Sequence, residues 1–118
     1  MSEQTVTIPL DKLAGLAVEH WRLATALGAE RGQGGGPTVR HALRKMEDFL
    51  RACELEVRSF DRLPYDAGLS ARVVDTVADS SLPAGGSVVA ETVSPLVLYK
   101  GKLLKVAEVV VASNQAAR

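Results

Sequence analysis

A glycine-rich segment is the first feature of the sequence that could bind a ligand. Residues 32–38 read Gly-Gln-Gly-Gly-Gly-Pro-Thr, and glycine runs can wrap backbone amides around a phosphate. The segment follows a predicted helix rather than a strand, and it lacks the Gly-Lys-Ser/Thr ending of a nucleotide-binding loop. Pro37 also removes an amide donor. We therefore interpret the segment as a flexible linker.

Histidine and cysteine are the residue types that could bind a metal or attack a substrate. His20 and Cys53 fall on the apolar faces of predicted helices, and His41 lies near Arg40 and Arg44. A metal site needs at least three converging ligands, and these residues have no recognised metal-binding spacing. A cysteine on an apolar helix face is typically a small buried residue rather than a nucleophile. We therefore expect neither a metal site nor a catalytic cysteine.

Acidic residues could act as general acid and base if two carboxylates converged in one pocket. The acidic residues in or beside the predicted strands have no pattern that would bring two together: Asp75, Asp79, Glu91 and Glu108. The sequence therefore predicts a protein that is not an enzyme, with no catalytic residues and no cofactor.

Lysines gather around a predicted turn near the end of the chain. Lysine on an exposed strand edge discourages strand-to-strand aggregation, which is one interpretation of these side chains. A contact with a protein partner is the other. The candidate partner-binding residues are Lys100, Gly101, Lys102 and Lys105.

The composition limits the classes of protein to which the chain can belong. It has 118 residues, 47% apolar and only 4% aromatic, so its core must consist mainly of Leu, Val and Ala. The 14 basic and 14 acidic residues cancel, which argues against nucleic acid or an anionic membrane as a partner. The single cysteine, an N-terminus without signal-peptide features and the absence of a long apolar run predict a cytoplasmic protein outside the membrane.

Two amphipathic helices are predicted in the first half of the chain. The first covers residues 11–29, with apolar-face residues at alternating spacings of three and four: Leu13, Leu16, His20, Leu23 and Leu27. Glycines end it, and residues 31–36 form the glycine-rich linker. The second helix begins at Pro37 and continues to residue 60, with a seam of Val39, Leu43, Met46, Leu50, Cys53, Val57 and Phe60.

The width of the two apolar faces predicts self-association. Ala17, Trp21 and Ala24 widen the first face, and Ala42 and Phe49 widen the second, so one helical hairpin cannot cover both. Two chains that pair through four helices would cover these faces, although a higher oligomer stays open. The predicted dimer interface comprises Val39, Leu43, Met46, Leu50, Cys53, Val57, Leu16, His20 and Leu23.

A small β domain is predicted over residues 63–113, after a helical region over residues 1–62. Its segments rich in β-branched or large apolar residues are 72–77, 87–93, 96–99 and 103–111. Turn-forming residues separate them, among them Pro83, Pro95 and Gly101. Residues 114–118 are predicted to be a loose tail. The predicted fold class is therefore α+β: a two-helix hairpin that dimerises into a four-helix bundle, followed by a small all-β domain.

Three motifs in the second half of the chain carry a family resemblance. Tyr65-Asp66-Ala67 stands where the family has Phe-Asp-Pro at the exit from a helical bundle. Residues 82–89 match a Leu-Pro-Ala-Gly-like turn before a Val-Val strand, and the closing pattern keeps its spacing at Gly101, Leu104, Ala107, Val109 and Val111. Over residues 60–112 the chain resembles GrpE, the nucleotide exchange factor of DnaK-type chaperone ATPases. It departs from the pattern at Leu96-Val97, at Lys105-Val106 and at Ser70-Ala71-Arg72.

The resemblance implies a homodimer with a four-helix bundle, in which a β domain contacts the ATPase. Such a factor binds the open nucleotide cleft better than the closed one, so ADP leaves faster and the factor performs no chemistry. Our leading hypothesis is a GrpE-like co-chaperone of a DnaK-like ATPase. Two alternatives stay open: a dimeric adaptor or assembly protein that uses the same fold to bind another protein, and an enzyme with a site at the dimer interface.

Overall fold

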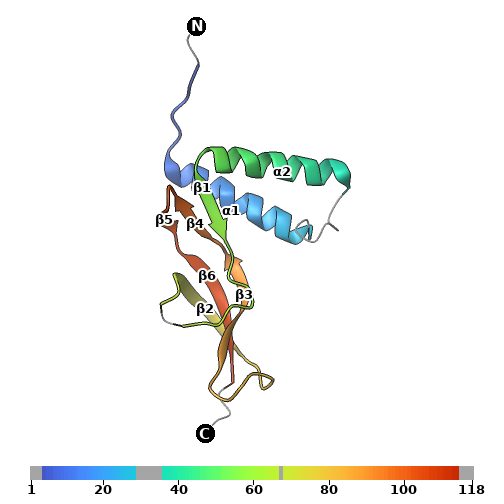
Figure 1. The fold of residues 1–118 in the computed structure, drawn as a ribbon, viewed down its shortest axis with the longest axis vertical. Coiled ribbons are helices and arrows are strands. Elements are labelled where there is room, and N and C mark those ends of the chain that lie inside the picture. Colours follow the sequence, from blue (N-terminus) through green and yellow to red (C-terminus); the bar gives the residue numbers. More distant parts are fainter. Residues whose placement is uncertain (1–3, 29–35, 67, 115–118) are drawn as a thin grey trace. The chain divides into compact units, whose positions relative to one another are not determined.

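The computed structural model describes residues 4–28, 36–66 and 68–114, and over these residues it contains two helices followed by six strands (Figure 1). The chain divides into a helical unit, Met1–Leu55, and a β-rich unit, Glu56–Arg118. The fold is therefore α+β, with the helices before the strands, as the sequence predicts.

The helical unit is a pair of antiparallel helices, α1 (Leu10–Ala26) and α2 (Pro37–Ala52) (Figure 1). Gly28 follows α1 with a φ of 66°, a left-handed conformation that ends a helix and that glycine adopts without strain. Gly36 is the N-cap of α2, and Pro37 occupies its first turn. The linker predicted over residues 31–36 otherwise lies outside the described residues.

The prediction that the second helix continues to residue 60 is wrong. Helix α2 ends at Ala52, Cys53 is its C-cap, and Glu54 adopts a φ of 66°, which cannot continue a right-handed helix. The next residues form strand β1 (Leu55–Arg58). Val57 was assigned to the helical seam, but it lies on this strand. The boundary between the two units consequently falls after Leu55 rather than after residue 62.

The described part of the β-rich unit contains two small sheets. The first has the strand order β1-β4-β5, with β4 (Leu96–Tyr99) antiparallel to β5 (Lys102–Lys105). The second has the order β2-β6-β3, formed by β2 (Ala71–Ala78), β3 (Ser87–Ser94) and β6 (Ala107–Ser113). Strand β6 pairs in parallel with β2 and antiparallel with β3.

The strands predicted over residues 72–77, 87–93 and 96–99 are confirmed with small changes at their ends. The segment predicted as one strand over residues 103–111 is instead two strands, β5 and β6, which meet at Val106. The chain therefore leaves one sheet and enters the other at this residue.

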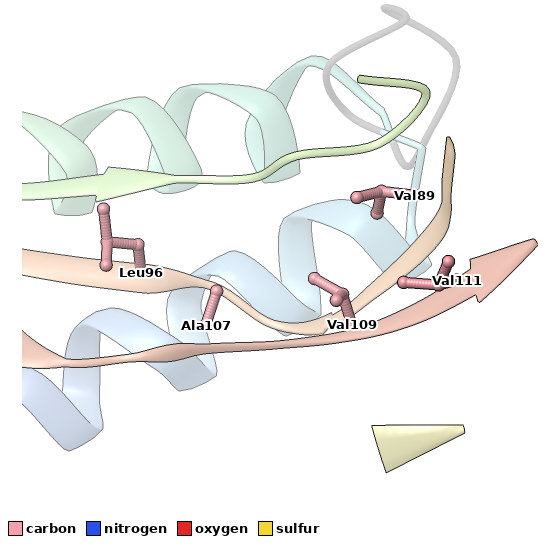
Figure 2. Close-up of a cluster of buried hydrophobic side chains, with 5 residues drawn as sticks. All are labelled: Val89, Leu96, Ala107, Val109 and Val111. Carbon is pink, nitrogen blue, oxygen red and sulfur yellow. The ribbon is translucent and has the colours of Figure 1, made fainter. Parts of the chain in front are cut away.

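Small aliphatic side chains form the core of the β-rich unit. Strands β3, β4 and β6 contribute a buried cluster of Val89, Leu96, Ala107, Val109 and Val111 (Figure 2). The three members from β6 alternate along the strand, as expected when one face of a sheet is buried. The low aromatic content predicted such a core.

Residues 60–65 run along β3 and cover its outer edge. The backbone amide of Arg62 donates to the Val89 oxygen at 2.8 Å, and the Val89 amide donates to the Leu63 oxygen at 2.8 Å. The Phe60 amide donates to Oγ1 of the buried Thr92 at 2.9 Å, while the Thr92 amide donates to an Asp61 carboxylate oxygen at 2.7 Å. These bonds satisfy backbone groups that an open edge would leave unpaired.

The prediction of a loose tail is wrong at its first residue, Asn114. The Asn114 amide donates to the Gly86 oxygen at 3.0 Å, and its side-chain Nδ2 donates to the Leu82 oxygen at 2.7 Å. Asn114 therefore ties the end of β6 to the turn before β3. Residues 115–118 lie outside the described residues.

Candidate functional site

The exposed apolar side chains of α1 and α2 form one candidate surface, which we call the helical face: Leu16, Leu23, Val39, Met46 and Phe49. Leu16 and Leu23 are two helical turns apart on α1, and Val39 and Met46 are two turns apart on α2. Phe49 is 52% exposed, an unusual position for a large aromatic side chain. A set of large apolar side chains left in water is typical of a protein interface.

A groove of about 210 Å³ lies between the two helices on this face. Its lining consists of Leu16, His20, Lys45, Met46, Phe49 and Leu50. Across the helix pair, His20 Nε2 forms a hydrogen bond of 2.8 Å with the Leu43 oxygen, which joins α1 to α2. The groove is therefore apolar, with a histidine that has a structural partner and a lysine as its charged group.

The residues predicted for a dimer interface have different positions in the structure. Four of them are exposed, namely Leu16, Leu23, Val39 and Met46, whereas Leu43 and Leu50 are buried and His20 and Cys53 are half-buried. Val57 lies on β1 rather than on a helix. Phe49 was predicted only to flank the seam, yet it is the most exposed of the large apolar side chains on the two described helices. Its place one turn from both Met46 and Cys53 is the signal in the sequence that marks it as part of this face.

The second candidate surface, which we call the basic hairpin, combines the turn between β4 and β5 with the two lysines of β5: Lys100, Gly101, Lys102 and Lys105. Lys100 and Gly101 form a two-residue turn in which both φ angles are positive, at 49° and 79°. Such a turn matches the twist of an antiparallel hairpin. Lys100 Nζ lies 5.3 Å from the centroid of the Tyr99 ring, a cation–π contact.

Exposed apolar side chains stand beside the lysines of the basic hairpin. Lys102 and Lys105 are exposed on β5, an edge strand, and Leu103 and Val106 are 49% and 44% exposed. Edge protection by lysine fits this position. A protein contact fits it as well, because an interface commonly combines apolar area with charges that orient the partner.

Two acidic residues of the β-rich unit, Glu108 and Asp79, have local structural partners. Glu108 on β6 forms an ion pair with Arg72 on the neighbouring strand β2. The Ser81 hydroxyl and then the Ser81 amide donate hydrogen bonds to Asp79, and they hold the pKa of its carboxyl below the ordinary 3.8. Within the described ranges, no three His, Cys, Asp or Glu side chains lie close enough to hold a metal ion.

Comparison of the chain with protein-family models and with curated proteins gives no match. Of the helices that the structure describes, none is long and apolar enough to cross a membrane. The helical face and the basic hairpin are therefore the features that indicate a function.

Proposed function

We propose that the chain is a GrpE-like co-chaperone. In this proposal the β-rich unit binds a DnaK-type chaperone ATPase and promotes ADP release, and the helical face pairs with a second copy of the chain. The observation that carries the proposal is the basic hairpin, in which a turn with two positive φ angles precedes exposed lysines and exposed apolar side chains.

The residues that carry the family resemblance support the proposal, because several of them have a demanding structural role. Gly101 has a φ of 79° in the hairpin turn, and a Cβ atom at Gly86 would lie 2.9 Å from the Pro83 oxygen. Ala107 and Val109 are fully buried in the core. These positions accept only glycine or small buried side chains, so a match with the GrpE pattern at them favours the same fold for the β domain.

The proposed activity needs differential binding rather than chemistry. A factor that binds the nucleotide-free ATPase more tightly than the ADP-bound form weakens ADP binding by the same ratio, and about 1.4 kcal/mol of difference gives a tenfold effect. The lysines would orient the hairpin on an acidic surface, and Leu103 and Val106 would add buried apolar area.

A dimeric adaptor for a different protein is the second candidate. One observation favours it. The family departures at Leu96 and Val97 are buried, whereas those at Lys105 and Val106 are exposed beside the basic hairpin. Changed residues on the surface of a fold are how the same fold acquires a new partner.

Release of labelled ADP from each DnaK-type ATPase of the source cell tests the proposal. We expect the chain to accelerate release from at least one of them, and we expect the variant Lys102→Glu/Lys105→Glu to lose most of this effect. The matched control is Lys12→Glu/Arg44→Glu, which changes the net charge equally on exposed helical residues. Unchanged release and no complex with any of these ATPases would discard the proposal. A stable complex with a protein that is not an ATPase would favour the adaptor.

A further inference from the structure

The sheet β2-β6-β3 has a second face, opposite the buried cluster of Figure 2. Residues paired across neighbouring strands point to the same side of a sheet, and the sides alternate along each strand. Val109 and Val111 of β6 belong to the buried cluster. Their neighbours on β6 therefore face the other way, together with the residues paired with those neighbours. We call this surface the outer sheet face: Arg72, Asp75, Val77, Val88, Glu91, Glu108, Val110 and Ala112.

An apolar strip runs along the middle of the outer sheet face. Val110 on β6 is half-buried. The next row along the strand has Val77 and Val88 on either side of the buried Ala112. Three valines of the flanking strands are 38–45% exposed: Val74, Val77 and Val93. Apolar side chains left in water on a sheet are typical of a face that another element covers.

Two carboxylates flank this strip at the same level. Asp75 on β2 and Glu91 on β3 are both paired in register with Val110, which lies between them on β6. Both are exposed, and in the part of the chain that the structure describes neither forms an ion pair. Glu108 belongs to the same face but is already paired with Arg72. The outer sheet face therefore offers negative charge on both sides of an apolar strip.

The spacing of the two carboxylates fits the width of an α-helix. Neighbouring strands lie about 4.8 Å apart, so the backbones at Asp75 and Glu91 are about 10 Å apart. A helix with its side chains is about 10–12 Å wide. A helix that lay along β6 would place its apolar side on Val110 and its two flanks beside the carboxylates. The rows from Glu108 to Ala112 span about 13 Å, the length of about nine helical residues.

We infer that the outer sheet face binds a basic amphipathic helix of a partner protein, with Lys or Arg on both flanks of an apolar stripe. Charge complementarity with Asp75 and Glu91 selects this occupant. A second copy of the same face would bring two more carboxylates that lack an ion pair, and its Arg72 is already paired, so like charges would meet. The inference goes beyond the proposed function, because the surface and the charge of the partner both differ from those of the basic hairpin.

Two synthetic peptides of about 14 residues and identical composition test the inference. The first carries leucines at i, i+3, i+4 and i+7 with lysines on both flanks, and the second has the same residues in an order without an apolar stripe. Fluorescence anisotropy with the full chain should show saturable binding of the first peptide and about tenfold weaker binding of the second. NMR of the full chain should locate the first peptide through shifts of the Val77, Glu91 and Val110 amides.

Removal of the two charges tests the contacts directly. Asp75→Asn/Glu91→Gln should raise the Kd of the first peptide about fivefold or more, because both ion pairs are lost with little change of shape. The asparagine can still accept the hydrogen bond from the Thr76 amide, so β2 should keep its structure. The matched control Glu19→Gln/Glu47→Gln removes the same charge from exposed helical residues and should leave the Kd nearly unchanged. Circular dichroism checks the fold of each variant.

Three results of these titrations would overturn the inference: no saturable binding of the first peptide, equal binding of the two peptides, or a Kd that Asp75→Asn/Glu91→Gln leaves unchanged. Sedimentation of the chain alone adds a fourth, since a dimer that this variant dissociates would assign the face to a second copy. Lys102→Glu/Lys105→Glu should bind the first peptide as the original chain does. A loss of ADP release with intact peptide binding, or the reverse, therefore separates the failure of one proposal from that of the other.

Discussion

Replacement of Gly101 by alanine isolates the backbone geometry of the basic hairpin. A Cβ atom at this position would have no neighbour within 4 Å, so the substitution adds no clash. It does force alanine to adopt a φ of 79°, the left-handed region that side chains disfavour. The expected loss of stability therefore comes from the backbone alone.

Gly15 in α1 provides a matched control, because the space around its Cβ position is also open and its φ is not positive. Alanine in a left-handed conformation costs about 1–2 kcal/mol, whereas alanine in a helix is about 1 kcal/mol more favourable than glycine. Both substitutions restrict the unfolded chain equally, so that contribution cancels in the comparison. Gly101→Ala should be less stable than Gly15→Ala by about 2–3 kcal/mol.

Thermal unfolding followed by circular dichroism measures both variants, with Trp21 fluorescence as a local probe of α1. We expect Gly101→Ala to lower the Tm and Gly15→Ala to raise it, by about 4–8 °C for each kcal/mol in a domain of this size. A Gly101→Ala variant as stable as the original would refute the positive-φ turn, and with it the geometry that positions the lysines.

Three further predictions concern the β-rich unit. Thr92→Val keeps the shape of a side chain that is 4% exposed but removes the oxygen that accepts from the Phe60 amide. The free energy of unfolding in urea titrations should therefore fall by about 1–3 kcal/mol. An unchanged free energy of unfolding would contradict the hydrogen bond between Phe60 and Thr92. Val109→Ala opens the fully buried core and should cost about 2 kcal/mol in the same assay, and a neutral effect would place Val109 outside the core. NMR titration of Asp79 should give a pKa below 3.8, and this pKa should rise in Ser81→Ala. The ionised Asp79 carboxylate stabilises the fold fully above pH 3.8, and this stabilisation is lost as the pH falls through the lower pKa of the folded state. An unshifted pKa would contradict the hydrogen bonds from Ser81.

The order of elements could be predicted because periodicity and turn residues agree over most of the chain. Pro37 at the start of α2, Gly28 after α1 and the alternating valines of β6 are each local signals in the sequence. The α+β class follows from them.

The end of α2 could not be predicted, because the apolar residues there fit the spacing of a helix and the spacing of a strand at the same time. Cys53, Val57 and Phe60 continue the helical spacing of the seam, while Leu55 and Val57 alternate as a strand does. Pairing in the sheet β1-β4-β5 selects the strand, and this long-range interaction leaves no local signature. The break at Val106 is similar, since only the existence of two sheets separates β5 from β6.

The candidate surfaces were partly predictable. The lysines around Gly101 are identified by charge and turn type, and the structure adds the exposed Leu103 and Val106 beside them. The helical seam correctly marks apolar positions, but a one-dimensional pattern cannot separate the buried Leu43 from the exposed Met46. That separation depends on where α1 packs.

The affinity of the chain for nucleotide-free and for ADP-bound DnaK-type ATPase tests the central claim most directly. Calorimetry on both forms should give a lower Kd for the nucleotide-free form, and the Kd of ADP should be higher for the complex than for the ATPase alone by the same ratio. Equal affinities for the two forms, or no binding to either, would contradict the proposed exchange activity.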